Sequence, residues 1–152
     1  MIKLEITPVR LLFIFVYFLF LIDVLVIEPN NLSVSHNDFG MFGGSGPPVK
    51  IVFISDIHVG QQRTGYLDEV VKKINALEPD IVLIGGDSIE GNEAELEMLE
   101  PLREIKAGYG TYAVLGNHDY GIWGCPTSSV LADKVVRRLE SMNITVLRNA
   151  NR

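Results

Sequence analysis

The stretch TYAVLGNHD, residues 111–119, decides the fold. Its first five residues form the short apolar pattern of a buried strand, and a glycine ends that strand. Three polar residues then follow in a row: Asn117, His118 and Asp119. Polar groups at the end of a buried strand each lose about 1–3 kcal/mol when they have no partner. An amide, an imidazole and a carboxylate at this position are therefore expected to form a site.

Two earlier segments repeat this order of an apolar run followed by polar residues. The run VKIVFIS, residues 49–55, is rich in β-branched residues, as a buried parallel strand is, and leads into Asp56 and His58. The run IVLI, residues 81–84, leads into two glycines and Asp87. Apolar residues at helical spacing predict helices over 66–77, 93–105 and 127–142, the second interrupted by Pro101. A fourth short strand is expected to begin at Ile144.

The three polar clusters are spaced like successive βαβ units, because 31 residues separate Asp56 from Asp87 and 30 separate Asp87 from Asn117. Right-handed crossovers make such strands parallel, so all three clusters emerge at one edge of the sheet. Open α/β sheets bind ligands at that edge. The sequence therefore predicts an α/β fold with one site built from three loops.

The residue types indicate a metal site. Carboxylates, an amide and imidazoles, without thiolates, favour Mn, Fe, Zn or a similar divalent ion. Asp87 comes between the other two clusters and could bridge two such ions, which clamp both oxygens of a displacement at phosphorus and lower the pKa of a shared water. Taken singly, an Asp after a strand is as often a helix cap or a turn residue. Three consecutive strand ends with ligand-type residues favour the site.

The motifs themselves resemble the first three sequence blocks of the calcineurin-like metallophosphoesterase family, over about residues 49–147. The blocks are Asp56-x-His58, Gly86-Asp87 and Gly116-Asn117-His118-Asp119. The resemblance implies an α/β fold with two packed sheets flanked by helices. It also implies hydrolysis of a phosphomonoester, phosphodiester or pyrophosphate bond by attack of a metal-bridging hydroxide.

The resemblance assigns roles to the site residues. Asp56, His58 and Asp87 would bind the first metal ion, and Asp87 and Asn117 would bind the second. His118 would be the catalytic acid that protonates the leaving oxygen, and Asp119 would orient it.

One feature departs from the family pattern. The family supplies further metal-binding histidines downstream, whereas this sequence has three histidines, none of them after His118. We therefore expect the N-terminal portion of the catalytic domain, with an exposed apolar sheet face. A second chain could supply the missing ligands. The alternative is a non-catalytic, membrane-tethered metal-binding or interaction module. A dinucleotide-binding domain is disfavoured, because Gly85-Gly86 lacks the required glycine spacing.

The N-terminal segment predicts a membrane anchor. Residues 11–27 are apolar except for Asp23 and are just long enough to span a bilayer. A signal peptide is less favoured because no small-residue cleavage site follows directly, and a buried core helix would need surroundings that the chain does not offer. Lys3 and Arg10 precede the segment and no basic residue follows before Lys50, which predicts a single-pass protein of the cell membrane with an extracytoplasmic catalytic domain.

The expected division of the chain is an anchor over residues 1–27, a flexible linker over 28–48 and the metallophosphoesterase domain over 49–152. Membrane-attached members of the family act on phosphodiesters or pyrophosphate-linked lipids, so a phospholipid-like substrate is expected. The net charge of −6 argues against nucleic-acid binding and leaves a metal to supply positive charge. The single cysteine, Cys125, excludes an internal disulfide.

Overall fold

The computed structural model describes residues 7–28, 31–40, 46–121 and 129–149. The chain divides into two compact units, residues 1–44 and 45–152, and each is described by itself. The expected boundaries at 27 and 48 stay predictions. Cys125 and the first two residues expected in the third helix, 127 and 128, lie outside the described residues.

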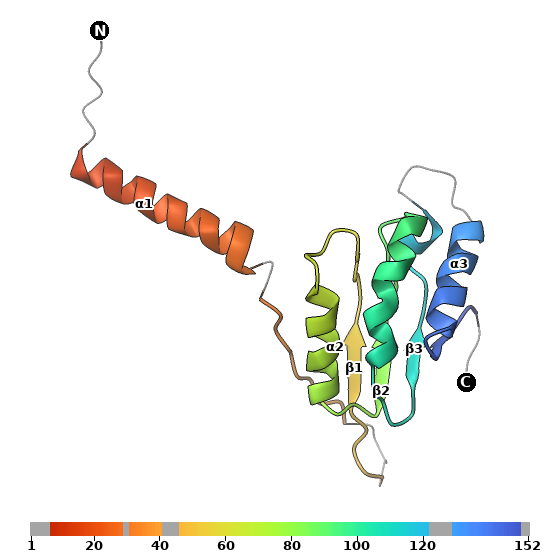
Figure 1. The fold of residues 1–152 in the computed structure, drawn as a ribbon. Coiled ribbons are helices and arrows are strands. Elements are labelled where there is room, and N and C mark those ends of the chain that lie inside the picture. Colours follow the sequence, from red (N-terminus) through yellow and green to blue (C-terminus); the bar gives the residue numbers. More distant parts are fainter. Residues whose placement is uncertain (1–6, 29–30, 41–45, 122–128, 150–152) are drawn as a thin grey trace. The chain divides into compact units, whose positions relative to one another are not determined.

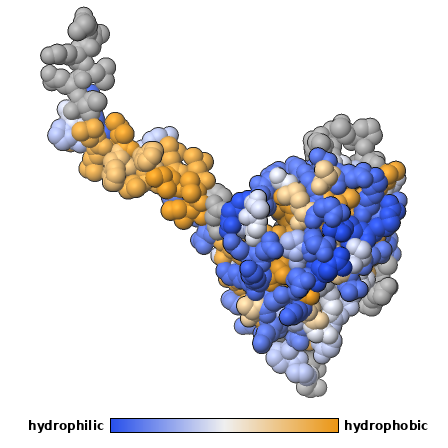
Figure 2. All heavy atoms as spheres, in the orientation of Figure 1, coloured by the Kyte–Doolittle hydropathy of each residue, from blue (hydrophilic) through white to orange (hydrophobic). Residues whose placement is uncertain are grey.

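The N-terminal unit contains one apolar helix. Helix α1, Pro8–Ile22, continues as the π-helical segment η1, Asp23–Ile27, so that the only acidic residue within the span marks the change of helix type. Together they form a 20-residue helix without a buried residue, long and apolar enough to cross a membrane by length and composition. Figure 2 shows apolar residues along most of this helix.

The second unit is built on a sheet of four parallel strands. The strands are β1 Ile51–Ile54, β2 Ile81–Ile84, β3 Thr111–Ala113 and β4 Ile144–Val146. They lie side by side in the order β1-β2-β3-β4. Ile51 pairs with Ile81, and Thr111 pairs with both Val82 and Ile144. The expected α/β class and parallel strands are confirmed.

The helices that connect the strands pack on one face of this sheet. They are α2 Tyr66–Ala76, η3 Glu93–Glu104, η4 His118–Tyr120 and α3 Ser129–Glu140. Right-handed crossovers between strands that follow one another in a single direction all return on the same side. In Figure 1 the helix over residues 93–104 passes in front of β2, while α2 is drawn beside β1 and α3 beside β3. The core that they share with the sheet includes Val71, Leu102, Leu139, Ile84, Ala113 and Ile144.

The opposite face of the sheet is open at its β1 side. Ile51 is 54% exposed and Phe53 is 65% exposed, whereas Val82 and Ile84 on the helix-covered face are buried. The continuous apolar run over residues 49–55 suggested a strand covered on both faces, and that expectation is wrong for the part of the chain described. The cause is the strand order, which directs every connection to the other side. The exposed apolar sheet face predicted from the sequence is present at Ile51 and Phe53.

The second predicted helix differs in type. Residues 93–104 form a 3₁₀-helix with Pro101 inside, and proline cannot donate the backbone hydrogen bond of a continuous α-helix. A capping box begins it: Asn92 Oδ1 accepts the Ala94 N–H at 3.0 Å, and Glu95 Oε2 accepts the Asn92 N–H at 3.3 Å. Glu95 Oε2 also accepts the Glu90 N–H at 2.7 Å. The start of η3 is thereby tied to the loop that follows β2.

Candidate metal centre

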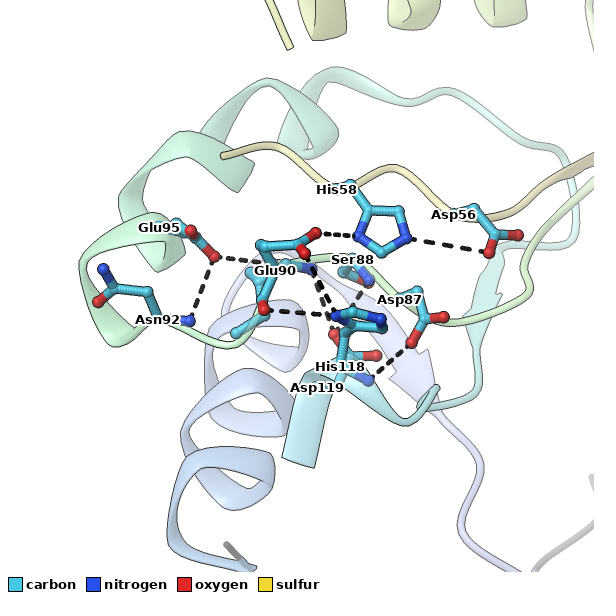
Figure 3. Close-up of polar contacts among 10 residues, drawn as sticks. Asp56, His58, Asp87, Ser88, Glu90, Asn92, Glu95, His118 and Asp119 are labelled. Carbon is cyan, nitrogen blue, oxygen red and sulfur yellow. Dashed lines mark hydrogen bonds and ion pairs between the residues drawn. The ribbon is translucent and has the colours of Figure 1, made fainter. Parts of the chain in front are cut away.

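Three loops at the carboxyl ends of β1, β2 and β3 meet at one edge of the sheet, as the βαβ spacing predicts (Figure 3). The first loop is joined to the second by backbone hydrogen bonds. The Asp56 N–H donates to Gly86 O at 3.1 Å, and the His58 N–H donates to Asp87 O at 3.0 Å. The third loop joins the second where the His118 N–H donates to Asp87 Oδ1 at 2.9 Å. Asp87 therefore contacts both neighbouring loops.

Three of the predicted metal ligands have a left-handed backbone. The φ angles are 54° at Asp56, 42° at His58 and 52° at Asp87. For residues other than glycine such a conformation costs about 1–3 kcal/mol and is found mostly where the surrounding structure imposes it at a functional site. Here the backbone hydrogen bonds between the loops hold these residues in place. Three of the six non-glycine residues with a positive φ in the described part of the chain are thus predicted ligands, and the other three are Glu78, Asn143 and Asn149.

Two glycines allow the second and third loops to approach each other. A Cβ on Gly116 would lie 2.1 Å from Asp87 Oδ1 and 2.5 Å from the Asp87 backbone nitrogen. A Cβ on Gly86, whose φ is 98°, would lie 2.5 Å from the Gly116 nitrogen. Each contact is too short for a side chain. Gly116 therefore does more than end a strand: it makes room for the Asp87 carboxylate.

The candidate ligand cluster contains His58, Asp87 and His118, each of which offers a ligand atom within 4.8 Å of the others. All three are half-buried, and the two imidazole rings meet edge to face with centroids 4.7 Å apart. Imidazole nitrogens and a carboxylate oxygen suit a divalent transition metal. This donor set fits the metal expected from the sequence.

The other two predicted ligands lie at the rim. Asp56 is exposed, and its Oδ1 lies 4.0 Å from His58 Nε2. Asn117 is exposed at the start of η4, and its backbone oxygen accepts the Tyr120 N–H at 3.2 Å. The structure thus brings Asp56 beside the cluster. The assignment of Asn117 to a second ion stays a prediction.

Asp119 is fully buried beneath the cluster. Its Oδ1 accepts the backbone N–H groups of Ser88 at 3.0 Å and Ile89 at 3.3 Å, and its Oδ2 accepts that of Gly116 at 2.9 Å. Burial raises the pKa of the Asp119 carboxyl above its ordinary value, and these three N–H donors oppose that rise. Asp119 therefore joins the second and third loops through their backbones. Its predicted action on the His118 ring stays a prediction.

Sequence reasoning missed Glu90. Its carboxylate lies between the two rings: Oε2 is 2.6 Å from His58 Nδ1, and Oε1 is 3.6 Å from His118 Nδ1 (Figure 3). The backbone oxygen of Glu90 is also 3.4 Å from His118 Nδ1. The signal available in the sequence was a second carboxylate in the loop after β2, three residues beyond Asp87.

Comparison with known proteins identifies the family of the chain. Residues 49–148 match the family model described as calcineurin-like phosphoesterase. An uncharacterized metallophosphoesterase of Helicobacter pylori strain 26695 is 35% identical over 105 residues, which cover 66% of this chain and 26% of that protein. The bovine "transmembrane protein with metallophosphoesterase domain" is 38% identical over 106 residues, covering 68% of this chain and 22% of that protein.

A third relative has a named substrate. The UDP-2,3-diacylglucosamine pyrophosphatase LpxG of Chlamydia muridarum is 32% identical over 108 residues, covering 64% of this chain and 31% of that protein. The chain thus spans between about a fifth and a third of the length of these three relatives. The family model covers about two thirds of the chain, and its range holds all three strand-end motifs. The chain belongs to the calcineurin-like phosphoesterase family.

Proposed function

We propose that this protein is a membrane-anchored, metal-dependent hydrolase of phosphoester or pyrophosphate bonds. The observation that carries the proposal is the cluster of His58, Asp87 and His118, with ligand atoms within 4.8 Å of one another, beside Asp56. These residues stand on three loops whose motifs match a family of phosphoesterases. A purely structural role would not require a strained backbone at Asp56, His58 and Asp87.

The charge of the site supports a metal. Asp56, Asp87 and Glu90 place carboxylates around the cluster, and a phosphate group that approached them unaided would meet like charges. Divalent ions bound there would neutralise these carboxylates, polarise the phosphoryl oxygens and supply a nucleophile at neutral pH. We propose two ions of manganese, iron or zinc type, as the residue chemistry allows.

Each residue of the site has a proposed role. Asp56, His58 and Asp87 would hold the first ion, and Asp87 with Asn117 would hold the second. The second ion would need further ligands, from other residues of the protein or from a second chain. His118 would give a proton to the leaving oxygen. Glu90 lies on the Nδ1 side of that ring, so the proton given to the leaving oxygen would come from Nε2. Asp119 would support His118 by holding the backbone of its loop.

The substrate that we propose is a lipid-linked phosphodiester or pyrophosphate. The 20-residue apolar helix would place the catalytic unit next to a bilayer, with the N-terminus in the cytoplasm and residues 49–152 outside. One relative is named a transmembrane protein, and another is named for the pyrophosphate of a diacylated sugar nucleotide. A membrane-anchored catalytic unit meets such substrates without having to extract them first.

The test is hydrolysis of bis(p-nitrophenyl) phosphate by the full-length chain in non-ionic detergent. We expect turnover that requires Mn²⁺, stops with a chelator and resumes when Mn²⁺ is restored. Asp87→Ala should be inactive, whereas Glu140→Ala, an exposed change on α3, should match wild type. Binding of Mn²⁺ without any turnover would contradict the enzyme and favour the non-catalytic, membrane-tethered metal-binding module.

A further inference from the structure

The loop between β2 and η3 carries a carboxylate with a specific place beside a predicted ligand. Glu90 Oε2 lies 2.6 Å from His58 Nδ1, a short hydrogen-bond distance. The His58 side chain is 19% exposed and that of Glu90 is 33% exposed, so solvent reaches the pair only in part. A carboxylate accepts and cannot donate, so the proton in this bond belongs on His58 Nδ1.

The consequence concerns the other nitrogen of the ring. With its proton on Nδ1, a neutral His58 has a free electron pair on Nε2. That nitrogen lies 4.0 Å from Asp56 Oδ1, which is too far for a direct hydrogen bond. Two ligand atoms that each lie about 2.0–2.2 Å from one ion can be separated by up to about 4.4 Å. The spacing of Nε2 and Oδ1 therefore suits two ligands of the same ion.

We propose that Glu90 is a positioning residue for His58, which fixes the ring with its proton on Nδ1 and Nε2 free for the metal. Ligating histidines commonly donate their second nitrogen to a carboxylate, which fixes the tautomer and raises the basicity of the ligand. The proposal deepens the proposed function, since it concerns the same metal site. Its first readout does not require any metal.

The surrounding structure holds Glu90 in position. Glu95 Oε2 accepts the Glu90 N–H at 2.7 Å and also forms the capping box with Asn92. The same carboxylate contacts the loop that carries His58, because a Cβ on Gly60 would lie 2.4 Å from Glu95 Oε1. The first turn of η3 therefore lies close to the His58 loop at Gly60 and holds the backbone of Glu90 through a hydrogen bond. An ordinary surface ion pair would have no such support and would contribute little to stability.

The first experiment observes the imidazole nitrogens directly. The full-length chain is labelled with ¹⁵N-histidine and studied by NMR, free of metal, in detergent and alkaline buffer. With three histidines in the sequence the spectrum stays simple, and exposed His36 serves as an internal reference. Wild type should show His58 with a protonated Nδ1 and an unprotonated Nε2. Glu90→Ala should move the proton of His58 toward Nε2, while Glu140→Ala should leave the spectrum of His58 unchanged.

The second experiment measures Mn²⁺ affinity by calorimetry on the same variants. Glu90→Ala should weaken binding about 10- to 100-fold, the usual effect of losing such an outer partner. Glu90→Gln keeps an acceptor oxygen and should retain the Nδ1 tautomer with a smaller loss of affinity. An unchanged His58 tautomer in Glu90→Ala, or an affinity within about threefold of wild type, would overturn the role of Glu90. If wild type bound no Mn²⁺, the proposed function would fall, and the tautomer alone would decide on Glu90.

Discussion

The close approach of the two central loops gives a quantitative prediction for Gly116→Ala. The new methyl group would lie 2.5 Å from the Asp87 backbone nitrogen and 2.1 Å from Asp87 Oδ1, whereas ordinary contact begins at 3.4 Å. The backbone of Asp87 must therefore move away by about 0.9 Å, the difference between 3.4 and 2.5 Å. Overpacking of this kind costs about 1–3 kcal/mol of folding free energy.

The same displacement should impair the metal site. Metal–ligand distances tolerate about 0.2 Å, and the expected shift of Asp87 exceeds this several times. We therefore expect Gly116→Ala to lower Mn²⁺ affinity by at least about tenfold. Urea unfolding of the full-length chain in detergent measures the stability, and calorimetry measures the affinity.

Gly108→Ala is the matched control. A Cβ at that position would lie 3.8 Å from its nearest neighbour, which is ordinary contact. This variant should equal wild type in Mn²⁺ affinity and be equally stable or up to about 1 kcal/mol more stable. The reasoning would be refuted if Gly116→Ala kept wild-type affinity and a free energy of unfolding within about 0.5 kcal/mol of wild type.

The remaining predictions concern individual site residues. Asp87→Ala should remove bound Mn²⁺ more completely than Asn117→Ala, because Asp87 would bridge both ions; equal residual metal after dialysis would count against the bridge. His118→Ala should slow phosphodiester hydrolysis about 10²- to 10⁴-fold with Mn²⁺ content unchanged, and loss of the ions would make His118 a ligand instead. Asp119→Asn should destabilise the fold by about 1–3 kcal/mol, since the amide turns an N–H toward backbone donors. The pKa of Asp119 is higher in the folded than in the unfolded chain. Its contribution to the free energy of unfolding is therefore complete below the unfolded-state pKa and declines as pH rises through the folded-state pKa. In urea unfolding, the free energy of unfolding of wild type should therefore exceed that of Asp119→Asn by less at neutral pH than at acid pH. A difference that grew with pH would show that the backbone donors lower the pKa of the carboxyl more than burial raises it.

The sequence could predict the position of the site because that position depends on periodicity. Asp56, Asp87 and His118 each follow an apolar run, and the βαβ spacing sends all three to one edge of the sheet. Parallel pairing and right-handed crossovers are general properties of such units. The α/β class, the parallel order and the meeting of the three loops followed from these properties and are confirmed.

What the sequence could not predict depends on local packing. No hydrophobic periodicity marks Glu90 in the sequence. Its place beside His58 depends on local packing, in which the Glu90 N–H donates to the carboxylate of the capping residue Glu95. Leucines and an isoleucine recur at every third position from 96 to 105, which a 3₁₀-helix places on one face. Because 3₁₀-helices longer than one turn are uncommon, this spacing is interpreted as that of an ordinary helix. The carboxylate of Asp119 could have faced the His118 ring or the backbone, and only the fold shows three backbone donors around it.

The most direct test of the account is whether the purified full-length chain binds Mn²⁺, measured by equilibrium dialysis with elemental analysis. The account predicts bound Mn²⁺ that a chelator removes, that returns on dialysis and that Asp87→Ala abolishes. The absence of bound Mn²⁺ in the folded wild-type chain, or equal binding by wild type and Asp87→Ala, would contradict the metal centre on which the proposed function rests.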